Sequence, residues 1–299
     1  MYGPLSIFFS FVIVFGVDVC MSNTNIEQQD QYNVDNAWPK VEPTNAEDCL
    51  AQFIGLSSSE QVGYHGAYRD WGCIRSSLDI RFEDKKIPAE QRMRVETSLL
   101  ETFAKDADPH FPPGARRHIE AAHLKWNTFR NTGTVFVGRH YGLPTRCVDW
   151  TSEPLIALFF ACRRDFEKPG VVWWIDNNVF SNTLATQWQS AYGKKEDIED
   201  DFEPDFINGT DKKILIRFKY PEWMERPTKQ KAWITLSSQY DVHHDEAIHR
   251  LGVQKCGRFI ISSQMKSDLL NKLNRLGING ATLGIGDLCV ETIAADVAG

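Results

Sequence analysis

A polar, turn-rich run passes directly into an apolar run between residues 140 and 161. Gly142 and Pro144 interrupt the first half, whereas residues 155–161 are all apolar. A segment that is apolar on every side is typical of a buried helix, and a proline is tolerated in a first helical turn. The sequence therefore predicts a central core helix over residues 152–164, with polar side chains delivered to its amino end.

The amino end of this helix is a candidate ligand site. Thr151 or Ser152 can cap the first turn, and its free amides favour an anionic or carbonyl-bearing ligand. The segment before it supplies charge, hydrogen-bond donors and a stacking surface through His140, Tyr141, Arg146, Asp149 and Trp150. The alternative is structural, because Arg146 and Asp149 could pair with each other and hold the turn.

Length and composition predict one globular domain preceded by a tail. The 299 residues are 42% hydrophobic, which suffices for a sizeable core. The net charge of −7 argues against nucleic acid as a partner, because binding to a phosphate backbone requires a basic excess. The seven cysteines form no C-x-x-C pair, so they predict reduced thiols in a cytoplasmic protein rather than a zinc ribbon or a disulfide scaffold.

Residues 1–45 are expected to precede the folded domain, which we place at residues 46–299. Residues 5–17 are apolar, but no Lys or Arg precedes them, and they are too short for a stable membrane span. Both Met1 and Met21 stay open as the start of the protein, with residues 1–20 as a weak leader. From Ser22 to about Asn45 the polar composition predicts a flexible tail that contributes little to the core.

The pattern along the chain predicts an α+β fold with early helices, the central buried helix and a late, mostly antiparallel sheet. Helices are expected at 48–56, 88–104, 115–130, 152–164 and 266–276, and strands at 61–68, 170–176, 214–220, 232–236 and 258–262. An acidic run at 194–205 is expected to be a solvated insertion.

Three ordered motifs resemble the FRG domain family. The run from His140 to Ala161 is similar to the family's His-Tyr-Gly-Leu-Pro-Thr-Arg, Asp-Trp-Thr and Pro-Leu-x-Ala-Leu-x-Phe-Ala sequence. Upstream, Tyr64-His65-Gly66 resembles the motif that names the family. Downstream, Gln254–Phe259 resembles its Ala-Gln-x-Gly-x-Phe segment with one extra residue. The resemblance covers about residues 62–290 and implies a composite pocket to which Tyr64 and Gly66 contribute.

The motifs are also similar, more distantly, to the layout of ADP-ribosyltransferases. This resemblance implies that His65, which replaces the Arg of the FRG motif, holds the nicotinamide side of NAD, and that Thr151 or Ser152 supports the site. The Glu of that layout has no counterpart, since Gln254 takes its place and an amide cannot act as a general base. His65 and Gln254 are thus the candidate catalytic residues, and NAD is the candidate cofactor. The FRG pattern is broken once more at Glu153, where a small polar residue is usual.

Two functions remain open on this basis. In the first, the domain binds a small nucleotide-like ligand at the start of the 152–164 helix, with ADP-ribosyltransferase-like activity undecided. In the second, the motif residues are structural and the domain is a non-enzymatic interaction module for a protein target. No metal is expected, because the cluster of ligand-type residues at 243–249 lacks the spacing of zinc or di-metal sites and predicts a solvated loop or helix start.

Overall fold

The computed structural model describes residues 32–56, 61–110, 130–192, 215–220 and 224–285. The helices are α1 Val34–Ala37, α2 Ala46–Gly55, α3 Ser77–Asp84, α4 Ala89–Ala107, η1 Asp108–His110, α6 Arg130–His140, α7 Pro154–Cys162, α8 Asn177–Tyr192, α10 Glu225–Lys229, α11 His244–Arg250 and α12 Ser263–Arg275. The strands are β1 Lys40–Val41, β2 Val62–Ala67, β3 Cys147–Thr151, β4 Gly170–Asp176, β5 Leu215–Lys219, β6 Ala232–Ser237 and β7 Cys256–Ile261.

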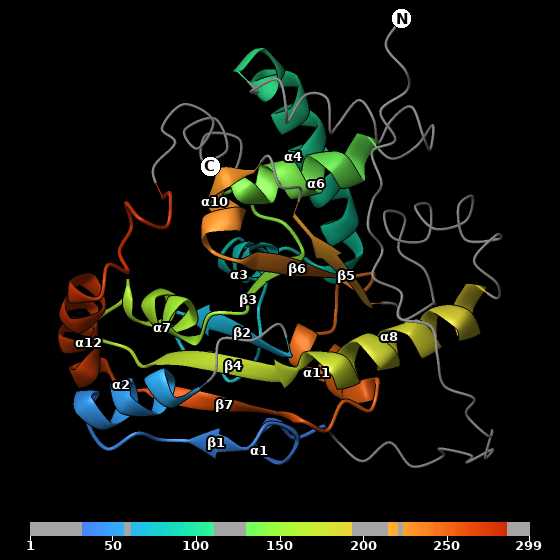
Figure 1. Ribbon diagram of the computed structural model, residues 1–299. Helices are drawn as coiled ribbons and strands as arrows, with labels where there is room; N and C mark the ends of the chain where they lie inside the picture. The colour runs from blue at the N-terminus through green and yellow to red at the C-terminus, as the bar shows by residue number, and fades with distance from the viewer. Residues whose placement is uncertain (1–31, 57–60, 111–129, 193–214, 221–223, 286–299) are drawn as a thin grey trace, which may run out of the picture.

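The strands form one mixed sheet in the order β1-β7-β4-β2-β3-β6-β5 (Figure 1). The short edge strand β1 runs parallel to β7, and every other neighbouring pair is antiparallel. The prediction of a single-domain α+β fold with a mostly antiparallel sheet is confirmed. The sheet is not confined to the late part of the chain, because β1, β2 and β3 come before the central helix.

Helices cover both faces of this sheet. On one face, α2, α7 and α12 bury apolar side chains against alternate residues of β2, β4 and β7, including Tyr64, Val172 and Phe259. On the other face, residues of α8 and α11 pack with the tryptophans of β3, β4 and β6. Successive residues of a strand point to opposite faces, so the two cores are built from interleaved positions of the same strands.

Helix α7 is the predicted central helix, and all but two of its nine residues are buried. It rests on the sheet at two glycines: a Cβ on Gly66 of β2 would overlap the backbone oxygen of Ala157, and one on Gly170 of β4 would overlap that of Ala161. Ala157 and Ala161 are one helical turn apart. The absence of two side chains therefore lets the helix backbone approach the sheet backbone along its length.

The carboxyl end of α7 is closed by a buried lysine. The Lys266 ammonium on α12 donates hydrogen bonds to the carbonyl oxygens of Tyr68 at 2.6 Å, Arg164 at 2.9 Å and Asp165 at 2.8 Å. These three bonds use all the donors of the ammonium, and a cation is favoured near the carboxyl end of a helix. Lys266 thus ties α12 to the ends of α7 and β2.

The segment at 32–45 differs from the prediction of a flexible tail. Trp38 is fully buried, its indole nitrogen donates to the carbonyl oxygen of Asp245 at 3.2 Å, and its ring meets that of Trp173 edge-on. The Tyr32 hydroxyl donates to the Asp245 carboxylate. A single tryptophan in a polar segment forms no periodic pattern and hardly changes the composition. The prediction from composition therefore missed that these residues pack on the domain. Residues 1–31 lie outside the described residues.

Other differences concern short elements. The prediction of a solvated loop or helix start at 243–249 is wrong in part, because α11 buries His244 and Asp245 almost completely. Several described elements were not predicted: α1, β1, α3, α6, β3, α8 and α10. The predicted helix at 115–130 and the insertion at 194–205 fall outside the described residues, apart from residue 130. None of the described helices is long and apolar enough to cross a membrane.

The contact between α7 and β2 can be tested by replacing Gly66 with alanine. We expect Gly66→Ala to lower the free energy of unfolding by at least about 2 kcal/mol, because the new methyl group meets backbone that cannot move aside cheaply. Gly55→Ala at the end of α2 is the control, since a Cβ there meets nothing within 4 Å. Urea unfolding measures both variants, and equal stabilities would disprove the close contact.

Candidate functional site

Two of the three family motifs lie side by side on neighbouring strands. Residues 64–66 are on β2 and residues 147–151 form β3, with Tyr64 paired to Thr151. Because paired residues share a face, Tyr64, Thr151 and Asp149 point to the α7 side, whereas His65 and Trp150 point to the other side. The motif therefore supplies two separate environments rather than one ring of side chains.

Tyr64 and Gly66 serve the contact with α7. Tyr64 is buried in the α7 core, and burial raises the pKa of its phenol to about 12. Gly66 provides the close approach to Ala157 described above. Neither residue is among those that line the polar cleft described below, so that cleft gives no support to a ligand-binding role for these two residues.

His65 and Trp150 belong to the tryptophan-rich face. The His65 Nδ1 atom lies 2.7 Å from the Asp149 carbonyl oxygen, which can only accept, so Nδ1 carries the proton. Burial lowers the pKa of His65 to about 4, although this hydrogen bond opposes the shift. Trp150 stacks on Trp233 with ring centroids 5.4 Å apart and donates to the Thr235 hydroxyl at 3.0 Å. Trp150 is 1% exposed and cannot stack on an external ligand.

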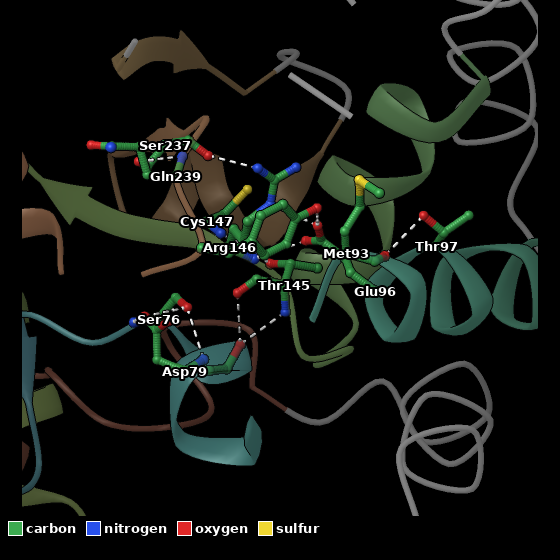
Figure 2. A network of polar contacts seen from close by, with 12 residues as sticks. Ser76, Asp79, Met93, Glu96, Thr97, Thr145, Arg146, Cys147, Ser237 and Gln239 are labelled. Carbon is green, nitrogen blue, oxygen red and sulfur yellow. Dashed lines mark hydrogen bonds and ion pairs between the residues drawn. The ribbon is translucent and has the colours of Figure 1, made fainter. Parts of the chain in front are cut away.

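Arg146 forms a buried ion pair with Glu96 of α4, not with Asp149 (Figure 2). Its Nε donates to a Glu96 carboxylate oxygen at 2.6 Å, and a terminal nitrogen donates to the Ser237 carbonyl oxygen at 2.9 Å. The Tyr240 hydroxyl donates to the same carboxylate at 2.7 Å, and the guanidinium lies over the Tyr240 ring. The predicted Arg146–Asp149 pair is wrong, because positions three apart on an extended strand point to opposite faces.

Asp149 pairs instead with Arg139, the residue that precedes His140. Arg139 of α6 donates its Nε to the Asp149 carboxylate at 2.7 Å, and the Tyr220 hydroxyl donates to the other carboxylate oxygen at 2.8 Å. Burial alone would raise the pKa of the Asp149 carboxyl, but Arg139 and Tyr220 outweigh it and hold that pKa below its usual value. Arg139 also donates to the Ser77 hydroxyl at 2.8 Å. The guanidinium is therefore fixed in place.

A polar cleft opens at this ion pair. It contains about 240 Å³ of empty space, part of it open to solvent, and is lined by Arg139, His140, Asp149, Tyr220, Arg226, Pro227 and Gln230. It lies beside the start of α7, since the Thr151 hydroxyl donates to the Gln230 carbonyl oxygen at 2.6 Å. Burial and the neighbouring Arg226 lower the pKa of His140 to about 4, so this imidazole is neutral at pH 7.

The residues expected to cap α7 take other roles. Thr151 is buried, and its hydroxyl accepts the Glu153 amide at 3.0 Å, so it holds the turn before the helix. The N-cap residue is Glu153, which makes no side-chain cap but pairs with Lys231. A carboxylate at this position competes with an anionic ligand for the helix end. Ser152 is half-buried beside it, and Tyr141 is buried.

The third motif does not join the other two. Gln254 is exposed in the turn before β7, and β4 separates β7 from β2. Two strand spacings alone place it about 10 Å from β2 across the sheet. The predicted convergence of three motifs is therefore wrong for Gln254, while His140 and Asp149 do meet in one cleft.

Sequence reasoning missed four residues that shape these sites: Glu96, Arg139, Tyr220 and Arg226. Only Arg139 carried a signal, since it stands next to His140 at the end of α6 and a basic residue is favoured there. The others come from elements distant in sequence. Within the residues that the structure describes, no group of three or more His, Cys, Asp or Glu could hold a metal ion.

The fold and the cleft define an α+β domain with a polar site at the amino end of its central helix. Residues 61–169 match the FRG domain family, which supports the resemblance predicted from the motifs. The matched region includes the first two motifs and ends before Gln254. No curated protein and no solved structure matches the chain, and the similarity to ADP-ribosyltransferases gains no support from these comparisons.

A double-mutant cycle distinguishes the two pairings of Arg146. We expect Arg146→Met and Glu96→Gln each to destabilise the fold by about 3 kcal/mol, because each leaves a buried charge without its partner. The double variant should lose less than the sum by at least about 1 kcal/mol. Arg146→Met combined with Asp149→Asn should be additive within about 0.5 kcal/mol. Strong coupling in the second cycle, measured by urea unfolding, would contradict the geometry.

Acid stability tests the buried histidines. Burial lowers the pKa of His244 to about 3, and its Nε2 atom has no hydrogen-bond partner among the described residues. Because this pKa lies below the unfolded value of 6.5, the unfolded chain takes up the proton first as the pH falls. Stability is therefore complete above about pH 6.5 and falls below it, by up to about 1.4 kcal/mol per pH unit for each such histidine.

We expect His244→Asn to remove about 1–2 kcal/mol of the stability difference between pH 7 and pH 5. Asparagine keeps a donor near the position of Nδ1, which bonds to the Thr235 backbone in the native protein. Urea unfolding at both pH values gives the difference. An unchanged difference in the variant would show that His244 takes up its proton equally in both states.

Proposed function

We propose that this FRG domain binds a small nucleotide-like ligand, with NAD among the candidates, through an anionic group held in the cleft beside the start of α7. The observation that carries the proposal is the pair of guanidinium groups, Arg139 and Arg226, in one polar cleft with a neutral imidazole. Guanidinium groups match the oxygens of phosphate and carboxylate in planar, two-point contacts.

The charges in the cleft favour an anion. Asp149 contributes one negative charge, which Arg139 and the Tyr220 hydroxyl already satisfy. Arg226 reaches the cleft from α10 and is held there by a 2.9 Å hydrogen bond from its guanidinium to the His140 carbonyl oxygen. Among the residues that line the cleft, two guanidinium groups thus accompany one carboxylate, and both guanidinium groups are already oriented, so little ordering is required when an anion binds.

The size of the cleft limits what enters it. The cleft is small, because even its roughly 240 Å³ of empty space includes open solvent, whereas sites that enclose a drug-sized ligand span roughly 300–1,000 Å³. We therefore propose that only an anionic end group of the ligand enters the cleft and that the remainder of a nucleotide lies on the surface outside.

An ADP-ribosyltransferase-like reaction with His65 and Gln254 as catalytic residues has less support. Neither residue lines the cleft. His65 lies on β2, whereas Gln254 precedes β7, and β4 separates these two strands. The binding proposal does not depend on them.

A non-enzymatic interaction module is the second candidate. The observation that favours it is that the motif residues make structural contacts. Tyr64 and Gly66 pack against α7, and Arg146 forms an ion pair with Glu96 of α4. In this case the motif specifies the fold, and a protein target is bound at another surface.

Calorimetry with ADP, ADP-ribose and NAD separates the two candidates. We expect binding of at least one of these ligands, weakened at least tenfold, or about 1.4 kcal/mol, by Arg226→Gln. Arg275→Gln is the matched control, because Arg275 is exposed on α12 and does not line the cleft. Circular dichroism must show that each variant is folded. Absence of heat at millimolar ligand would reject the ligand-binding function and leave the interaction module.

A further inference from the structure

His140 is the one imidazole among the seven residues that line the cleft. It ends α6, and its ring meets that of Tyr141 edge-on, with centroids 4.7 Å apart. Its backbone carbonyl anchors Arg226. An anion that reaches Arg226 in this small cleft therefore comes close to the imidazole as well.

The charges around His140 come from four segments. Arg226 on α10 disfavours a proton on the imidazole, and Asp149 on β3 favours one. Asp149 is already satisfied by Arg139 of α6 and by the hydroxyl of Tyr220, which follows β5. Burial is the largest cause of the lowered pKa of His140 and Arg226 adds to it, so in the absence of a bound anion the imidazole stays neutral well below pH 7. A bound anion changes this balance, because a nearby negative charge stabilises the imidazolium.

We propose that the cleft takes a terminal phosphate monoester as its dianion, and that binding adds a proton from the solvent to the His140 imidazole. This inference rests on the proposed function and specifies its ligand class. The proton passes from a buffer acid to the free ring nitrogen, and no other bond is made or broken. The anion then lies between two cations, Arg226 and the His140 imidazolium, beside the fixed Arg139.

The same argument selects a monoester over a diester. A phosphate monoester carries nearly two charges near neutral pH and offers three terminal oxygens, whereas each phosphate of a pyrophosphate diester carries one. Only a terminal group can enter a cleft of this size without burying its second substituent. Nucleotides that end in a phosphate are therefore expected to bind more tightly than NAD, in which both phosphates are linked on two sides.

Sulfate is the sharpest probe of proton uptake, because it is a tetrahedral dianion that does not itself titrate near pH 6. Calorimetry at pH 6 in two buffers with different ionisation enthalpies counts the protons taken up. We expect about half a proton per bound sulfate, since a nearby opposite charge raises a pKa by about 1–3. Sulfate affinity should rise as the pH falls from 7 to 5.5.

His140→Gln should bind sulfate with no proton uptake and with affinity that no longer depends on pH. His249→Gln is the matched control, because His249 is exposed on α11 and does not line the cleft, and it should keep the uptake of the native protein. AMP should bind at least tenfold more tightly than NAD.

The possible failures are distinguishable. If sulfate binds without proton uptake, the role of His140 is overturned while the proposed function stands. If NAD binds more tightly than AMP, the monoester class is overturned, and the cleft still binds nucleotides. If sulfate, inorganic phosphate and all nucleotides fail to bind the folded protein, both this inference and the proposed function are wrong.

Discussion

The close approach of α7 to the sheet is the constraint on which the rest of the structure depends. Gly66 and Gly170 leave room for the backbone at Ala157 and Ala161, so the helix lies directly on β2 and β4. Lys266 then fixes the carboxyl end of the helix through three carbonyl oxygens. The glycines thus set the distance between α7 and the sheet, and Lys266 fixes the carboxyl end of the helix. The amino end of α7 therefore lies at a defined place beside β3 and the cleft. Within the motif Tyr64-His65-Gly66, the first and last residues therefore serve to position this helix.

Much of the fold was readable from the sequence, for physical reasons. The apolar run at 155–161 can only be buried, and β4 was placed at its observed bounds because its residues are continuously apolar or aromatic. Strand β3 was missed because its alternation of Val148 and Trp150 with polar residues follows a turn-rich run without a break. Trp38 shows the same limit, since one buried side chain has no period.

The site was predictable only in part, because ion pairs are chosen by strand geometry and not by distance along the chain. Asp149 and Arg146 are three residues apart, yet each finds a partner on a helix, Arg139 on α6 and Glu96 on α4. Glu96 stands 50 positions before its partner, among other charged residues of an amphipathic helix. Nothing in its local sequence separates it from a solvated glutamate. The local sequence around Tyr220 and Arg226 does not predict their place in the cleft either, because only the pairing of β5 and β6 brings their segments to β3.

Strand β3 shows how one motif can serve both the structure and the proposed binding site. Its pleat sends Val148 and Trp150 into the tryptophan-rich core and turns Asp149 and Thr151 toward the cleft. A slip of one residue in the pairing of β3 with β6 would place Asp149 among the tryptophans, and an unpaired buried carboxylate there would cost several kcal/mol. The buried Arg146–Glu96 pair, immediately before the strand, opposes this slip because it fixes the backbone of Arg146 as well as its side chain. The Arg146–Glu96 pair, which does not line the cleft, thus favours the register in which Asp149 faces the cleft. The structural role of the motif is therefore compatible with the proposed ligand-binding role.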